Sequence, residues 1–342
     1  MTKTLPNILL LCAGILVSLA LAETTFRVYA PRLGTYDDFL RFKTAAHDQG
    51  MSLRAYGTHL DEKDFAKTME WRDRLGWNRP TAWYDSSIPA DEAYSVLILG
   101  DSVTQGDGLS PDATYPYLLS RRLAGVRILN AGLSGYGIDQ MLFKGLQLAA
   151  EHELNLVLFA YIPHDLVRVG KRFMYGSGKP KFAFNGDEAF LLPAPEAGPF
   201  HTTYDNALRT SSLLFWYLRY DIWPNREYYA PWLYRDYYRK VFAHIQERMA
   251  TLAANRSLDV VFVKLTNSFD FRGEQILIPL ATEVFSTSSS SGVHYYDVDL
   301  CVGNKLDIED PEYESIFYFH PTAEGHRLFA DCLSELIASR IP

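Results

Sequence analysis

The sequence is poor in cysteine and in net positive charge, and each shortage excludes a class of function. Its 342 residues include only 3 cysteines, which show neither a CxxC pair nor the spacing of a metal site. The formal net charge of −8, without any basic cluster, argues against a nucleic-acid partner. HExxH, Walker and GxGxxG patterns are also absent. We therefore predict no metal, no cofactor and no nucleic acid as a partner.

The cysteines allow at most one internal bridge. Cys12 lies within an apolar run, so only Cys301 and Cys332 remain as a possible pair. Unpaired cysteine is among the most often buried residue types, so the simpler interpretation is two separate core residues.

The first 25 residues have the pattern of an export segment. Lys3 precedes an apolar stretch over residues 5–22, whose length is at the border between a signal peptide and a membrane-spanning helix. Ala20 and Ala22 fit a small-residue cleavage site, whereas the length of the stretch slightly favours an uncleaved anchor. We interpret residues 1–25 as a signal peptide or membrane anchor. The remainder is then predicted to lie outside the cytoplasm, in the periplasm or the extracellular medium, either anchored or secreted.

Five apolar segments alternate with amphipathic ones, which is the pattern of an α/β protein. The segments expected as buried strands are residues 96–99, 126–129, 154–161, 258–265 and 293–298. Helices are expected over 115–124, from Asp139 onwards, over 235–254 and after the histidine motif near the carboxyl end. Strands that alternate with helices form a parallel sheet with right-handed crossovers. We therefore predict an α/β domain over residues 94–342 with a parallel sheet of about five strands.

Two segments lie outside the predicted sheet. Residues 26–93 are interpreted as an amino-terminal extension that packs onto the domain, with a helix over 61–74. Residues 168–254 form an insertion rich in aromatic side chains. These include Phe173, Tyr175, Phe182, Phe184, Phe190, Phe215, Trp216, Tyr217, Tyr220, Trp223, Tyr228, Tyr229 and Trp232. Such side chains can stack on sugar rings or form an apolar lid, but a subdomain core or an interface is the favoured interpretation.

Three polar loops follow the first three predicted strands. They contain Ser102, Gly135 and His164, respectively. The carboxyl ends of parallel strands meet at one edge of a sheet, which is where open α/β sheets bind their ligands. The segment Gly100-Asp101-Ser102 on its own is equally consistent with an ordinary turn. The convergence of the three loops favours a site.

Three motifs in chain order resemble the SGNH (GDSL) hydrolase family over residues 94–342. They are Gly100-Asp101-Ser102, the segment Asn130–Gly135, and His320-Pro321. The resemblance implies a flavodoxin-like three-layer sandwich and a serine hydrolase. An exported, anchored member with an amino-terminal extension is similar to bacterial relatives that act on acylated cell-surface polysaccharides. The α/β-hydrolase fold is excluded as an alternative, because its motif requires glycine two positions after the nucleophile, where this chain has Thr104.

The resemblance also implies a role for each matching residue. Ser102 would be the nucleophile and His320 the base that takes its proton, because a hydroxyl of high pKa needs an adjacent base. The backbone N–H groups of Ser102 and Gly135 would form the oxyanion hole. Asp101 and Asp165 would support the site.

The chain departs from the family pattern at two positions. His164 replaces the asparagine that donates to the oxyanion, and its ring N–H can still donate. Phe317 occupies the place of the triad aspartate, three residues before the histidine. The acids considered as substitutes are Asp299, Asp310, Glu312 and Glu314. Otherwise the site works as a dyad, with weak activity or none, since loss of the acid costs about 10⁴-fold in a serine protease.

Two functions follow from these motifs. The first is an exported serine esterase or O-acyltransferase that acts on ester-linked acyl groups of a glycan, acetyl in the first instance. The second is a catalytically degenerate scaffold that binds polysaccharide or an assembly partner through the aromatic insertion. Phe317 is the residue that favours the second.

Overall fold

The computed structural model describes most of the residues after position 90. In full, these are residues 4–29, 82–84, 88–89, 91–174, 177–192, 218, 226–268, 274–287, 292–307, 311–318 and 320–342. The helix expected over 61–74 lies outside the described residues, as do Tyr175, Phe215, Trp216, Tyr217, Tyr220 and Trp223 of the insertion.

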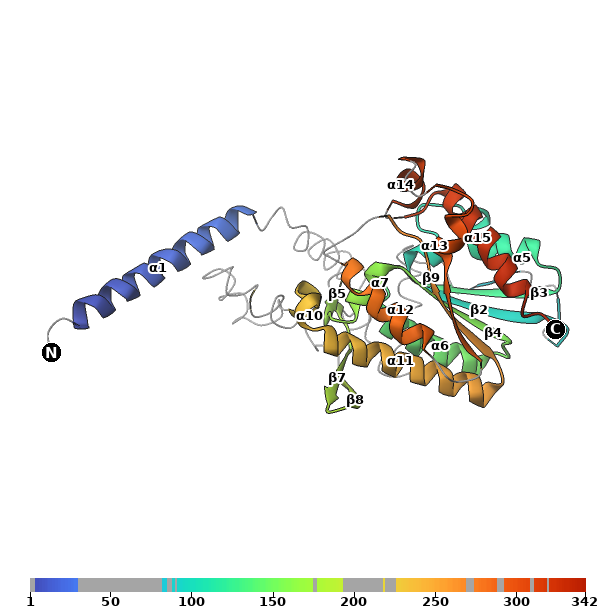
Figure 1. The fold of residues 1–342 in the computed structure, drawn as a ribbon, viewed down its shortest axis with the longest axis horizontal. Helices are drawn as coiled ribbons and strands as arrows, with labels where there is room; N and C mark the ends of the chain where they lie inside the picture. Colours follow the sequence, from blue (N-terminus) through green and yellow to red (C-terminus); the bar gives the residue numbers. More distant parts are fainter. Residues whose placement is uncertain are drawn as a thin grey trace, which may run out of the picture.

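A six-stranded sheet forms the centre of the domain, in the order β1-β3-β2-β4-β9-β10 (Figure 1). Its strands are β1 (Ala82–Tyr84), β2 (Tyr94–Gly100), β3 (Val126–Gly132), β4 (Leu156–Tyr161), β9 (Asp259–Lys264) and β10 (Val293–Asp297). The last five are the predicted strands, and all neighbours among them pair in parallel. Their spatial order is the flavodoxin-like one, which confirms the predicted fold class. The sixth strand, β1, comes from the extension and pairs antiparallel with β3 at the edge.

Helices cover both faces of the sheet and complete the three layers (Figure 1). One face carries α6 (Ile138–Glu151), α11 (Arg235–Arg256) and α12 (Ile278–Ser286); the other carries α5 (Tyr115–Arg122), α13 (Val298–Val302) and α15 (Ala323–Ala338). Successive side chains of a strand point to opposite faces. In β2, Leu97 and Leu99 therefore join one core cluster, while Val96 and Ile98 join the other.

The insertion contributes two short hairpins and one short helix before α11. They are β5 (Phe173–Met174) with β6 (Ser177–Gly178), β7 (Lys181–Asn185) with β8 (Glu188–Leu192), and α10 (Arg226–Tyr229). The side chains of Phe182 and Tyr228 are buried in the core cluster on the α11 face. Those of Phe190 and Trp232 are exposed. Part of the aromatic content thus extends the core, as the favoured interpretation expected.

The two ends of the chain give two further results. Helix α1 (Thr4–Tyr29) covers the predicted export segment. Over the residues described here, none of the helices combines the length and apolar character that a bilayer span requires. Cys301 and Cys332 form a disulfide that joins α13 to α15, which corrects the expectation of two separate core residues. The two cysteines are 31 residues apart, and no local sequence pattern indicates that they pair, because only the docking of the two helices brings the thiols together.

Candidate active site

Ser102 begins a short helix directly after the buried strand β2. Asp101 is the N-cap of this helix, α4 (Ser102–Gln105), and its Oδ1 accepts a hydrogen bond of 2.9 Å from the Val103 N–H. An aspartate at this position satisfies one of the amide groups that a helix start leaves without a partner. The sequence predicts no helix between this strand and residue 115, which is wrong, because α4 follows the strand directly. The cap holds Ser102 at the carboxyl edge of the sheet.

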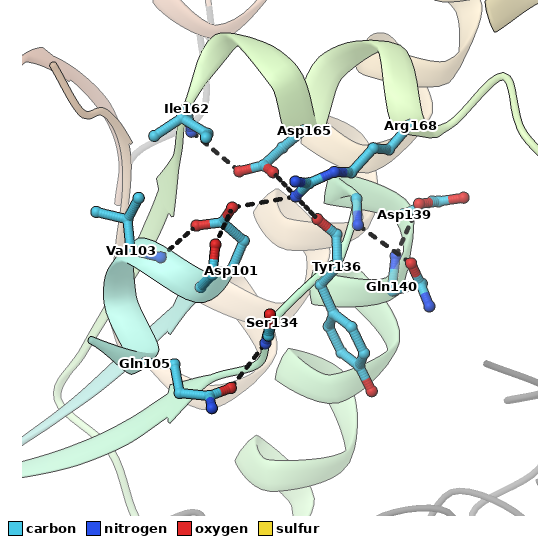
Figure 2. Close-up of polar contacts among 12 residues, drawn as sticks. Asp101, Val103, Gln105, Ser134, Tyr136, Asp139, Gln140, Ile162, Asp165 and Arg168 are labelled. Carbon is cyan, nitrogen blue, oxygen red and sulfur yellow. Dashed lines mark hydrogen bonds and ion pairs between the residues drawn. The ribbon is translucent and has the colours of Figure 1, made fainter. Parts of the chain in front are cut away.

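Two glycines place the second loop against α4. A Cβ on Gly132 would clash with the backbone of Thr104 and Gln105, so its absence lets β3 end directly beneath the helix. The loop that follows is tied to the helix because the Ser134 N–H donates to Gln105 Oε1 at 2.7 Å (Figure 2). Gly135 has a φ of 81°, a conformation that side chains with a Cβ rarely adopt. The structure therefore places Gly135 at the same edge as Ser102.

Ser102 and His320 are in direct contact although 218 positions separate them in the chain. The distance between Ser102 Oγ and His320 Nε2 is 2.9 Å. Ser102 is buried and His320 half-buried. His320 lies immediately before α15, whose first turn is capped by Thr322. The contact is the geometry that a serine nucleophile and its general base require.

One guanidinium group connects the three loops at this edge (Figure 2). Arg168 Nη1 donates to Asp101 Oδ2 at 3.0 Å, to the Tyr136 carbonyl at 2.8 Å and to Asp165 Oδ1. Asp101 belongs to the serine loop, Tyr136 to the glycine loop, and Asp165 to the helix α7 (Pro163–Arg168) after β4. Arg168 thus connects the segments that carry Ser102, Gly135 and His164, whereas His320 reaches the site from a fourth segment, before α15.

Sequence reasoning missed Arg168 because it stands at the boundary assigned to the insertion. The one local signal is its position three residues after Asp165, a spacing that places both side chains on one face of a helix. The spacing indicates a contact only if the segment is helical and buried. The sequence analysis predicts a loop at His164, whereas the structure has the helix α7 there.

The electrostatics of this network are dominated by burial. Asp101 and Asp165 are 1% and 0% exposed. Burial raises the pKa of Asp165 well above its usual range, and the charge of Asp101 raises it further; Arg168 opposes both effects. The Ser102 hydroxyl donates toward Asp101 Oδ2 at 3.2 Å as well as facing His320. Because Asp101 Oδ2 also accepts from Arg168, its negative charge is compensated within the protein.

His164 is the second residue of α7, at the same edge of the sheet. It is half-buried, and the centre of its ring lies 6.3 Å from that of Tyr228 in an edge-to-face arrangement. Tyr228 belongs to α10, so the insertion packs directly beside the third loop of the site. The contact gives the insertion a place next to the candidate catalytic groups.

The position of the family's triad acid is filled by a core residue. Phe317 is 0% exposed, and its ring lies 5.4 Å from that of Phe329 and 5.1 Å from that of Tyr313. Of the substitutes considered, Asp299 accepts from Thr266 Oγ1 at 2.6 Å and from Lys264 Nζ. Glu312 and Glu314 are exposed on α14 (Pro311–Phe317), and Asp310 lies outside the described residues. The acid that would orient His320 stays a prediction.

The comparisons with known proteins give structural neighbours alone. No family model matches the chain, and no curated protein matches it. The chain is similar to a member of the lipolytic G-D-S-L family from Veillonella parvula, at 11% identity over 71% of this chain and 98% of that one, with a TM-score of 0.39. It is also similar to LAE5, an alpha/beta hydrolase from the metagenome of Lake Arreo, at 14% identity over 73% and 97%, with a TM-score of 0.42.

A third neighbour is Axe2, an acetylxylan esterase from Geobacillus stearothermophilus, at 12% identity over 73% of this chain and 95% of that one, with a TM-score of 0.37. The neighbours named here are a lipolytic G-D-S-L protein, an alpha/beta hydrolase and an acetylxylan esterase.

Proposed function

We propose that this chain is a serine esterase of the SGNH type that acts on ester-linked acyl groups. The observation that carries the proposal is the 2.9 Å contact between Ser102 Oγ and His320 Nε2 at the carboxyl edge of a parallel sheet. Position and pairing together distinguish this serine from an ordinary turn residue.

The reaction proceeds in two acyl-transfer steps. Ser102 Oγ attacks the ester carbonyl carbon while its proton moves to His320 Nε2, and the carbonyl oxygen becomes an oxyanion. The backbone N–H groups of Ser102 and Gly135, with the ring N–H of His164, serve as its donors. The oxyanion collapses, the bond to the alcohol breaks, and His320 returns the proton to the departing alkoxide. Water then attacks the acyl carbon while His320 takes its proton. The bond to Ser102 Oγ breaks, His320 returns the proton to Oγ, and the free acid leaves.

Arg168 is a positioning residue in this scheme. The Ser102 hydroxyl has two acceptors within reach, His320 Nε2 at 2.9 Å and Asp101 Oδ2 at 3.2 Å. The guanidinium of Arg168 compensates the charge of Asp101, which makes this carboxylate a poorer competitor for the serine proton. The proton is thereby directed to His320.

The proposed substrate is an acylated glycan outside the cytoplasm. The disulfide between Cys301 and Cys332 supports export, because such bridges persist in oxidising compartments. Residues 1–25 then act as the export segment. A sugar hydroxyl that replaces water in the second step would make the same site an O-acyltransferase.

The test is the replacement of the nucleophile. We expect Ser102→Ala to keep its fold and to lower turnover of an aryl acetate by at least about 10³-fold. A fluorophosphonate probe should label the wild type and not the variant. Ser315→Ala, at an exposed position of α14, is the matched control and should behave as the wild type. A Ser102→Ala variant that keeps more than a few per cent of wild-type turnover refutes the assignment.

A second candidate is a non-catalytic scaffold that binds glycan or an assembly partner. The observation that favours it is Phe317, which stands where the family has its acid and cannot orient an imidazole. The same probe decides between the two. A folded wild-type protein whose Ser102 is not labelled would favour the scaffold.

A further inference from the structure

A buried tyrosine lies between the two segments that carry Ser102 and His320. Tyr115 is the first residue of α5, and it is 0% exposed. Its hydroxyl shares a hydrogen bond of 2.8 Å with Thr104 Oγ1, and Thr104 is also 0% exposed. Thr104 belongs to α4, the helix that begins at Ser102. The side chain of Tyr115 therefore contacts the serine helix directly.

The backbone of Tyr115 contacts α15, the helix that follows His320. The Tyr115 N–H donates to His326 Nδ1 at 3.0 Å, and the two rings stack at 5.7 Å between their centres and 28° between their planes. The first amide groups of a helix have no acceptor within it, and Thr114, the N-cap of α5, caps none of them with its side chain in the described part of the chain. His326, which is 1% exposed, supplies an acceptor from α15 instead. Tyr115 thus joins α15 to α4.

The protons of this connection are defined by its geometry and its burial. Because His326 Nδ1 accepts a hydrogen bond, the proton of the neutral ring is on Nε2. Burial raises the pKa of Tyr115, while the hydrogen bond with Thr104 acts in the opposite direction. The tyrosine hydroxyl therefore keeps its proton and stays a partner of Thr104.

The serine end of this connection is closely packed. A Cβ on Gly100 would lie 1.9 Å from Thr104 Oγ1, so the glycine lets this hydroxyl lie against the end of β2. The Gly106 N–H donates to the Ser102 carbonyl at 2.9 Å and closes the turn of α4 that contains Thr104. We therefore expect a shift of Thr104 to move Ser102, which lies two positions before it in the same turn.

The histidine end is closely packed as well. A Cβ on Gly325 would lie 2.9 Å from Pro321 Cβ, so the glycine lets the residue after His320 pack on the first turn of α15. The Thr322 N–H donates to the Ile316 carbonyl at 2.9 Å, which fixes the same segment to α14. The place of His320 therefore depends on the place of α15.

We propose that Tyr115, Thr104 and His326, here called the tyrosine bridge, are positioning residues that hold the base within hydrogen-bond distance of the nucleophile. The catalytic part of this statement rests on the proposed function, whereas the hydrogen bonds themselves do not. Proton transfer needs donor and acceptor about 2.6–3.2 Å apart, and a displacement of about 1 Å costs about 100-fold in rate. The tyrosine bridge therefore acts on turnover by setting the distance of 2.9 Å between Ser102 Oγ and His320 Nε2.

The first test removes a single oxygen atom. Tyr115→Phe should lower kcat and kcat/KM for an aryl acetate equally, by about tenfold or more, because the lost interaction acts on the chemical step. The matched control is Tyr295→Phe, which breaks a hydrogen bond of 3.1 Å between Tyr295 Oη and Thr282 Oγ1 in the core of the opposite face. This control should keep the kcat of the wild type. A purely structural role would lower the Tm of Tyr115→Phe but leave the kcat of the two variants equal, and that result overturns the proposal.

The second test replaces the acceptor of the tyrosine bridge. His326→Asn keeps a side-chain acceptor close to the position of Nδ1, whereas His326→Ala has none. We expect His326→Asn to keep kcat within about threefold of the wild type and His326→Ala to lose about tenfold or more. Equal losses in the two variants contradict the proposal.

The hydrogen bond can also be measured in the wild type, so the proposal stays testable if a variant fails to fold. Nuclear magnetic resonance of the isotope-labelled protein should show a scalar coupling between the Tyr115 amide nitrogen and His326 Nδ1 across their hydrogen bond. The same spectra should show His326 Nδ1 without a proton. A protonated Nδ1, or no coupling, overturns the tyrosine bridge whether or not the wild type is active.

The outcomes separate this proposal from that of the esterase. A wild type that hydrolyses aryl acetate, with Tyr115→Phe and Tyr295→Phe equally active, leaves the esterase standing and removes the tyrosine bridge as a positioning device. A wild type that shows the coupling, but neither turnover nor labelling of Ser102 by a fluorophosphonate, removes the esterase and leaves only the hydrogen bond.

Discussion

Removal of the Arg168 guanidinium should destabilise the whole domain. The change Arg168→Met keeps most of the side-chain volume and leaves Asp101 and Asp165 buried without their cation. Breaking a buried ion pair from one side costs about 3–5 kcal/mol, because the remaining charge stays desolvated. A domain of this size loses about 2–4 °C of Tm per kcal/mol. The product of the two is a decrease in Tm of about 6–20 °C.

Differential scanning calorimetry measures this decrease in Tm. Two further variants test whether its cause is the loss of the buried ion pairs. Asp165→Asn in the Arg168→Met background removes one uncompensated carboxylate and should recover about half of the lost Tm. Arg248→Met, at an exposed position of α11, should change Tm by about 2 °C or less. An Arg168→Met variant as stable as Arg248→Met would refute the central role of Arg168, and a double variant less stable than the single one would refute the electrostatic explanation.

Four other changes test separate parts of the structure. His164→Asn should keep turnover of an aryl acetate while His164→Ala loses about 100-fold, and equal kcat in the two variants would exclude a donor role. Replacing both Cys301 and Cys332 by alanine should lower the free energy of unfolding in urea by about 3–4 kcal/mol, since the bridge closes a loop of 31 residues; an unchanged urea midpoint contradicts this. Phe317→Asp should unfold the domain rather than supply the triad acid, because the side chain is 0% exposed; a folded variant with raised turnover would show otherwise. Burial raises the pKa of Asp165 above its ordinary 3.8, so the folded state binds this proton more tightly than the unfolded chain does. The wild type should therefore gain stability relative to Asp165→Asn as the pH falls from about 7 to about 4. A constant difference between the urea midpoints of the two proteins over this range would refute the shift.

The sheet and its site edge were predictable from sequence because both depend on local patterns. Each parallel strand is buried on both faces and appears as a continuous apolar run, as Val96–Leu99 does. The order of strands and helices then places Ser102, Gly135 and His164 at one edge. The distance between Ser102 and His320 depends on the docking of α15, which no local pattern records.

The features that sequence reasoning missed are decided by tertiary contacts. Strand β1 is three residues long, too short for a periodic pattern, and exists through its pairing with β3. In the sequence Arg168 has no feature that distinguishes it from a surface cation, whereas in the structure it is buried and paired with Asp101 and Asp165. Phe317 was judged as a replacement for an acid, whereas the structure shows it as part of the core beneath α15.

The distance along the chain between Ser102 and His320 determines when the site comes into existence. A ribosome completes the serine loop long before it reaches the histidine, and α15 must still dock on α5. One contact of that docking is the buried hydrogen bond of 3.0 Å from the Tyr115 N–H to His326 Nδ1. Until then Ser102 lacks the contact with His320. If the chain is exported and catalytic as proposed, its unfolded form carries a serine without its base, and esters in the compartment of synthesis meet no assembled site.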